Sequence, residues 1–163
     1  MYIPLIVIIC SLTLIAFQDM KYRQIHIVLP VLLFIASLYS VTNKFKDALG
    51  LKNTAFNMGL MAIIFFILVF YMTIKNKRLL NPFENYFGLG DLLFYMAISP
   101  FFQLHTYILF FIISMIFSII LHLVFRKFVS HDSIPLAGFS ALLLIVIIGK
   151  DFILNCNSLT LLK

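Results

Sequence analysis

The sequence predicts an all-α polytopic membrane protein with about six transmembrane helices. Hydrophobic residues make up 63% of the 163 residues and charged residues only 11%, whereas about a quarter of residues are charged in soluble globular domains. The mean hydropathy is +1.11. Long apolar runs alternate with short polar segments, and inside lipid a helix satisfies its own backbone hydrogen bonds. We therefore expect residues 1–163 to form a single transmembrane domain without a sizeable soluble part.

The first half of the chain contains three apolar runs. Ile3 to Phe17 is interpreted as a retained span that ends at the polar segment Gln18–Gln24. The second run extends from about Ile25 to Val41, with Pro30 about one turn inside it. The third run, Ala55 to Ile74, has about the 20 residues that are needed to cross roughly 30 Å of hydrocarbon. Each run is thus predicted to be a membrane helix.

Three further runs follow in the second half: Gly88 to Phe102, Thr106 to Phe125 and Ile134 to Ile148. The first of them is short, because Leu92 to Phe102 alone would rise only about 16 Å as a helix. To cross the bilayer, this helix would have to begin near Asn85 or Tyr86. We therefore expect Gly88 and Asp91 to lie in the membrane or at its inner boundary.

Two carboxylates stand at the ends of apolar runs. Asp19 follows the first run, and Asp91 begins the fourth, directly behind Gly88 and Gly90. An Asp at the centre of a membrane helix costs roughly 2.5–3.5 kcal/mol, so such a residue is by default a functional one. Two spans separate the aspartates, and an even number returns the chain to the same side. Lys and Arg are more frequent in the loops on that side, which predicts that it faces the cytoplasm.

A pair of neighbouring carboxyl groups can hydrolyse a peptide bond without a nucleophilic side chain. One group stays protonated while the other is ionised, because two adjacent negative charges repel each other. The ionised group takes a proton from water, and the protonated group polarises the carbonyl and then helps to protonate the leaving amine. Gly88 and Gly90 have no Cβ, so we expect them to admit an extended substrate backbone beside Asp91.

No metal site and no cofactor are predicted. Cys10 and Cys156 have no CxxC pattern or Cys/His cluster around them, and the four histidines do not cluster in the sequence. The net charge of +6 fits basic residues that meet lipid headgroups beside the spans. We therefore expect membrane lipid, and not nucleic acid, as the partner of these basic residues.

These motifs and their order resemble the type IV prepilin peptidases, a family of GxGD intramembrane aspartic proteases that includes the archaeal preflagellin peptidases. Gly88-Leu89-Gly90-Asp91 matches the family's second motif. Asp19, followed by basic residues and Ile25, is similar to the first, which continues Ile-Pro-Asn in the family. Ile134–Phe139 is similar to the Ile-Pro-Phe-Gly-Pro that opens the family's last span. The resemblance covers nearly the whole chain.

The sequence also departs from the family pattern. His26 and Ile27 stand where the family has Pro-Asn, and Leu93 stands where it often has Lys. Many bacterial members carry an insertion with paired cysteines, which is linked to N-methylation of the cleaved pilin. The connector after Asp19 has only a few residues, so the resemblance implies a short form without methyltransferase activity.

The resemblance implies an aspartic endopeptidase of the cytoplasmic membrane, with its active site near the cytoplasmic face. It would remove the basic leader peptide of a type IV prepilin or pilin-like precursor, just before the precursor's apolar helix. Asp19 and Asp91 would be the catalytic acid–base pair, and Gly88 and Gly90 would bind the substrate. Glu84 is either a solvated loop residue or a contact for the basic leader.

Two other functions fit the same composition. A small proton- or cation-coupled transporter would use the carboxylates as a relay along a path through the bilayer. A non-catalytic scaffold subunit of a pilus or secretion machine would need neither aspartate. The sequence leaves open which precursor is cleaved and which oligomer is formed.

Overall fold

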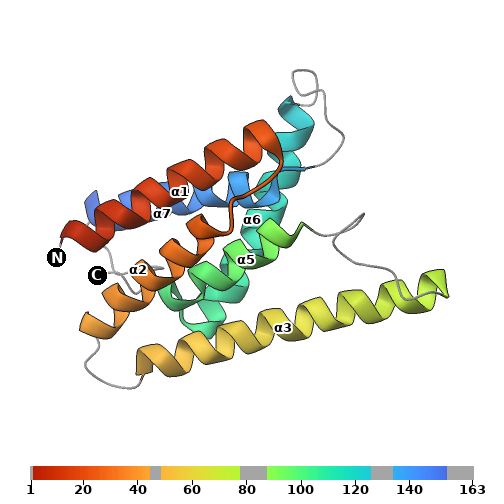
Figure 1. Cartoon of the computed structure of the whole chain (residues 1–163), viewed down its shortest axis with the longest axis horizontal. Helices are drawn as coiled ribbons and strands as arrows, with labels where there is room; N and C mark the ends of the chain where they lie inside the picture. Colours follow the sequence, from red (N-terminus) through yellow and green to blue (C-terminus); the bar gives the residue numbers. More distant parts are fainter. Residues whose placement is uncertain (1, 45–48, 78–87, 126–133, 154–163) are drawn as a thin grey trace.

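The structure, a computed structural model, describes residues 2–44, 49–77, 88–125 and 134–153 (Figure 1). These residues form helices only: α1 (Tyr2–Tyr22), α2 (Val28–Lys44), α3 (Leu49–Asn76), α5 (Leu89–Ile98), the 3-10 helix η1 (Ser99–Phe101), α6 (Leu104–Phe125) and α7 (Leu136–Ile153). The all-α membrane fold is thereby confirmed. By length and composition, α1, α3 and α6 can cross a membrane, and α2 and α5 are shorter apolar helices. Glu84, Asn85 and Tyr86 lie outside the described residues.

The helices extend beyond the apolar runs at their ends. Helix α1 continues past Phe17 to Tyr22, so Asp19 lies inside its last turns and not in a loop. Pro30 is the third residue of α2, where the backbone N–H would have no partner within the helix in any case. Lys21 and Lys75 occupy the last turns of α1 and α3, where a positive charge offsets the negative end of the helix dipole.

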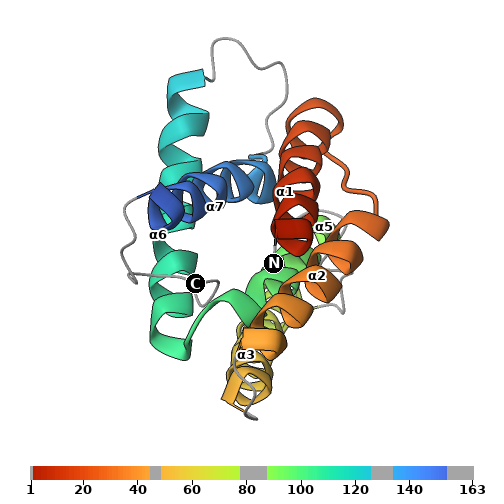
Figure 2. The ribbon, with the colours of Figure 1, turned by 90° about the vertical axis from the view of Figure 1, so that its left-hand side faces the viewer.

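Helix α1 packs between α2 and α7, and α2 also packs against α5 (Figure 1). Helix α7 crosses α6 and reaches α1, as the view in Figure 2 shows. The end of α1 and the starts of α5 and α7 lie on the same side of the molecule. Three segments that are far apart in the sequence therefore meet at one end of the bundle.

The fourth apolar run does not form a full span, which corrects the expected start near Asn85. Helix α5 has 10 residues, is preceded by Gly88 as its N-cap, and gives way to η1 at Ser99, so it rises about 15 Å. Pro100 lies in η1 and lacks the N–H that a continuing α-helix would use. Asn57 of α3 is buried there, and its Nδ2 donates to the carbonyl oxygens of Ser99 and Phe102, both at 2.8 Å. The side chain of Asn57 thus replaces the helical donors that the break removes.

We expect Asn57→Ala to lower the free energy of unfolding by about 2–4 kcal/mol, because it leaves two buried carbonyl groups unpaired at about 1–3 kcal/mol each. The measurement is reversible unfolding in mixed detergent micelles. Asn43→Ala, at an exposed position of α2, is the control and should change stability by less than about 0.5 kcal/mol. Equal effects of the two substitutions would contradict the role given to Asn57.

Tyr95 connects the three helices of the second half. Its hydroxyl lies 2.8 Å from Ser114 Oγ of α6 and 3.0 Å from Ser140 Oγ of α7. The hydroxyl of Tyr107 in α6 donates to the Tyr95 carbonyl at 2.9 Å. Tyr95 and Tyr107 are fully buried, and a buried polar network with every member paired fixes one arrangement. Because Tyr95 lies one turn after Asp91, this network fixes the start of α5 relative to the start of α7.

The outer surface is apolar along the long helices. On α3 the exposed side chains include Ile63, Phe66, Phe70 and Ile74, each more than half exposed. Such a continuous apolar face is unfavourable in water but matches the hydrocarbon of a bilayer. These residues therefore support the membrane location that the composition predicts.

Candidate functional site

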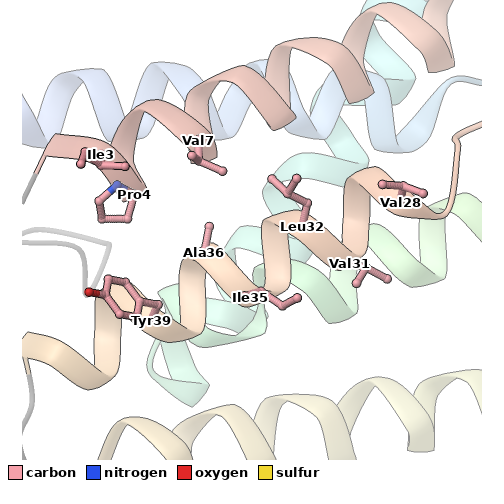
Figure 3. A pocket seen from close by; sticks show the side chains of 9 residues that line it. All are labelled: Ile3, Pro4, Val7, Val28, Val31, Leu32, Ile35, Ala36 and Tyr39. Carbon is pink, nitrogen blue, oxygen red and sulfur yellow. The ribbon is translucent and has the colours of Figure 1, made fainter.

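An open groove lies between α1 and α2, but the side chains that line it cannot carry out acid–base chemistry. Its walls are apolar, apart from the Tyr39 hydroxyl, and consist of Ile3, Pro4, Val7, Val28, Val31, Leu32, Ile35, Ala36 and Tyr39 (Figure 3). Hydrolysis needs a group that accepts a proton near neutral pH, and none of these side chains does so. The two aspartates are therefore the candidate site.

Asp19 lies in the last turns of α1 and faces α7. Its side chain is buried, with 6% of the residue exposed. The Oδ2 atom accepts a hydrogen bond of 2.6 Å from the backbone N–H of Gly138. The residues are 119 positions apart in the sequence, so this contact depends on the packing of α1 against α7.

Asp91 lies in the first turn of α5 and is partly buried. Its Oδ1 atom accepts a hydrogen bond of 2.8 Å from the backbone N–H of Ala137. Its own N–H donates to the carbonyl of Gly88 at 3.0 Å, which closes the turn before the helix. The two aspartates are therefore held by consecutive amides of one peptide segment.

Every backbone N–H from Leu136 to Phe139, at the start of α7, has a hydrogen-bond partner. Pro135 has no N–H, Leu136 N–H donates to Ile134 O at 2.9 Å, and Phe139 N–H donates to Pro135 O at 3.1 Å. The remaining amides, those of Ala137 and Gly138, donate to the two aspartates. The first amides of a helix have no partner within it, and the helix dipole favours negative charge there. The start of α7 is thus a docking site for two carboxyl groups.

Gly138 has to be small for this contact. A Cβ at this position would lie 3.1 Å from Asp19 Oδ2 and 3.2 Å from Asp19 Cβ, which is tighter than ordinary van der Waals contact. The absence of a side chain therefore allows α1 and α7 to approach until the carboxyl group reaches the amide.

The two glycines of the Gly88–Asp91 motif contact residues of the protein itself. A Cβ on Gly88 would lie 2.7 Å from Asp91 Oδ2, and a Cβ on Gly90 would lie 3.0 Å from Ile25 Cδ1. Gly88 has φ −67°, so it is needed for space and not for an unusual backbone angle. Both glycines are thus explained in part by packing; their contact with a substrate stays a prediction.

Arg23, four residues after Asp19, interacts electrostatically with both aspartates. Burial lowers the pKa of its guanidinium, and the charges of Asp19 and Asp91 partly raise it again. The positive charge therefore lies within electrostatic range of both carboxyl groups. Within the described part of the chain, no three His, Cys, Asp or Glu side chains gather as a group that could hold a metal ion.

A model of the type IV leader peptidase family matches residues 6–123, which is more than half of the chain. The chain belongs to this family. No curated protein and no solved structure shows significant similarity to it. The predicted membership of the prepilin peptidase family is confirmed, and with it a peptidase that processes leader peptides. The matched residues of this leader peptidase include both aspartates but end before α7.

Part of the candidate site of this leader peptidase could not be predicted from the sequence. The amides of Ala137 and Gly138 carry no side-chain signal, although the resemblance had pointed to Ile134–Phe139. A proline followed closely by small residues at the start of an apolar run does mark a helix N-terminus with accessible donors. The sequence marks Arg23 only as one of the basic residues after Asp19. Its environment depends on the packing of three helices, so no local pattern could have singled it out.

Proposed function

We propose that this leader peptidase is an intramembrane aspartic endopeptidase, with Asp19 and Asp91 as its acid–base pair. The observation that carries the proposal is the binding of both carboxyl groups by the neighbouring amides of Ala137 and Gly138. The charge of Asp19 acts on Asp91, so the pair favours a state with one shared proton, because ionising both would place two interacting negative charges together. One ionised and one protonated group is the state that peptide hydrolysis by water requires.

The reaction would follow from this shared proton. The ionised carboxyl group takes a proton from a water molecule as its oxygen attacks the scissile carbonyl carbon. The protonated group donates to the carbonyl oxygen as the tetrahedral intermediate forms. When the intermediate collapses, the C–N bond breaks, the leaving amine receives a proton from one carboxyl group, and a hydroxyl group of the intermediate returns a proton to the other as the new carbonyl forms. The products are a new carboxyl terminus on the leader and a new amino terminus on the mature protein, and the pair returns to its singly protonated state.

The proposed substrate is a pilin-like precursor, the class that the family implies. We propose cleavage of its basic leader just before its apolar helix, at the cytoplasmic face of the cell membrane, by a single transmembrane domain. Gly88 is exposed beside Asp91, which supports an approach of the substrate backbone from that side. A proton- or cation-coupled transporter is less well supported, since its carboxylates would have to line a path through the bilayer. Asp19 and Asp91 instead lie together at the start of α7, where neighbouring amides bind them.

The test is co-expression with a pilin-like precursor that has a basic leader followed by an apolar helix. We expect a shortened product whose new amino terminus, read by sequencing, lies directly before the apolar helix. Asp47→Asn, in the polar segment after the second apolar run, is the control and should leave processing unchanged. Cleavage that persists at the full rate after Asp19→Asn and Asp91→Asn would contradict the proposal.

A further inference from the structure

Arg23 has a backbone conformation that an L-amino acid adopts only at a cost. Its φ is +55°, in the left-handed region. Its N–H donates to the carbonyl of Asp19 at 3.1 Å, which is the hydrogen bond of a left-handed helix C-cap. Glycine is the usual residue at such a position. An arginine at a position whose backbone favours glycine indicates that its side chain contributes something that glycine cannot.

The side chain of Arg23 is partly buried and incompletely paired. Its Nε and Nη1 atoms are buried and have no hydrogen-bond partner among the described residues. Buried donors of a charged group are unfavourable when they are left unpaired. Arg23 therefore combines an unfavourable backbone conformation with an unfavourable environment of its guanidinium group. Non-glycine residues in strained conformations cluster at active sites, where the surrounding structure holds them in place.

Arg23 interacts electrostatically with both aspartates but forms an ion pair with neither. Arg23 forms no ion pair with a described residue, yet Asp19 and Asp91 both interact electrostatically with it. A direct ion pair would neutralise a single carboxyl group and leave the other without support. A positive charge at a distance from both favours one negative charge on the pair as a whole. This is the charge state that the proposed hydrolysis needs.

We propose that Arg23 is a positioning residue that holds the Asp19–Asp91 pair in its singly ionised, working state. The inference rests on the proposed function and deepens it. Arg23 sets the pH range in which the pair works, and it does so through space, without contact with the reacting atoms.

The other described groups around the pair are either neutral or directed elsewhere. From α5, Tyr95 faces Asp91, but it is a neutral hydroxyl whose partners are Ser114 and Ser140. The first turn of α7 contributes backbone amides only. Lys21, the other basic residue at the end of α1, is exposed, and its Nζ lies over the rings of Phe17 and Tyr22. Among the described residues that act electrostatically on Asp19 and Asp91, Arg23 is therefore the source of positive charge.

The experiment measures kcat/KM for precursor processing against pH in wild type, Arg23→Gly, Arg23→Asn and Arg23→Lys. Gly and Asn both tolerate the left-handed backbone, so the two neutral variants test the charge without adding strain. An opposite charge within about 4–6 Å lowers the pKa of a carboxyl group by about 1–3 units, and the lower end of that range applies to Arg23, which forms no direct ion pair with either aspartate. Without the positive charge, the singly ionised state forms only at higher pH. We expect both limbs of the bell-shaped profile to move by about one unit to higher pH in the neutral variants, and Arg23→Lys to restore the wild-type position.

Lys77→Gly is the matched control, because Lys77 also has a left-handed backbone, with φ +52°, directly after α3. This substitution removes the same charge and relieves the same backbone strain away from the aspartates, so its profile should equal that of wild type. Thermal unfolding in detergent should show that Arg23→Gly is no less stable than wild type. An unchanged pH position in both neutral variants, or a shift of equal size in Lys77→Gly, would overturn the inference while leaving the aspartic mechanism intact. Loss of the mechanism itself would instead show as full activity of Asp91→Asn.

Discussion

Replacing Asp91 by Asn is expected to lower kcat for precursor processing by at least about a thousand-fold, because a neutral amide can neither accept a proton from water nor share one with Asp19. Asn has nearly the same shape, so the hydrogen bond from Ala137 N–H can be kept through the amide oxygen. Thermal unfolding in detergent should therefore change little. The measurement is the rate of processing of a purified precursor in detergent at several pH values.

Asp19→Asn should cause a loss of similar size, and the double variant should be no slower than either single one. Groups that act as one unit give effects of this non-additive kind, since removing either one disables both. Independent carboxylates would instead multiply their effects in the double variant. A double variant slower than each single variant by a further large factor would contradict the shared site.

Gly88→Ala is expected to lower activity by about 10- to 100-fold while leaving the fold in place. The new Cβ would lie 2.7 Å from Asp91 Oδ2, so the carboxyl group has to turn away. A displacement of about 1 Å at a reacting group can cost on the order of a hundred-fold in rate. The backbone of Gly88 has φ −67°, which alanine adopts freely, so stability should change by less than about 1 kcal/mol. The measurements are kcat for processing and unfolding in detergent.

Gly59→Ala supplies the control for this substitution. Gly59 lies within α3, and a Cβ there would meet no atom within 4 Å. Alanine inside a helix is more stable than glycine by roughly 0.5–1 kcal/mol, so this variant should be fully active and slightly more stable. Full activity of Gly88→Ala would show that the orientation of Asp91 does not depend on the space that this glycine provides.

The sequence predicted the parts of this protein that depend on local chemistry. Apolar runs predicted the helices, and the even number of runs between Asp19 and Asp91 predicted that both lie on one side. The structure brings the two side chains to one segment of α7. This agrees with the predicted placement, although the catalytic role itself stays a prediction.

The rest depended on contacts between distant segments. The early end of α5 depends on Pro100 and on Asn57, a residue of α3 that supplies the missing donors. The residues of the fourth run do not reveal that Asn57 supplies these hydrogen bonds. The approach of Asp19 to Gly138 requires α1 and α7 to pack closely, and the backbone angle of Arg23 follows from how α1 ends. Such features arise from tertiary packing, which local patterns do not encode.

The amides of Ala137 and Gly138 lie far downstream of the aspartates that they bind. During synthesis Asp19 and Asp91 are therefore made 119 and 46 residues before the amides that bind them. Until α7 arrives, the acids have to remain hydrated or protonated, because an unsupported negative charge in lipid is costly. On the proposed mechanism, the insertion of α7 is therefore the step that completes the paired site.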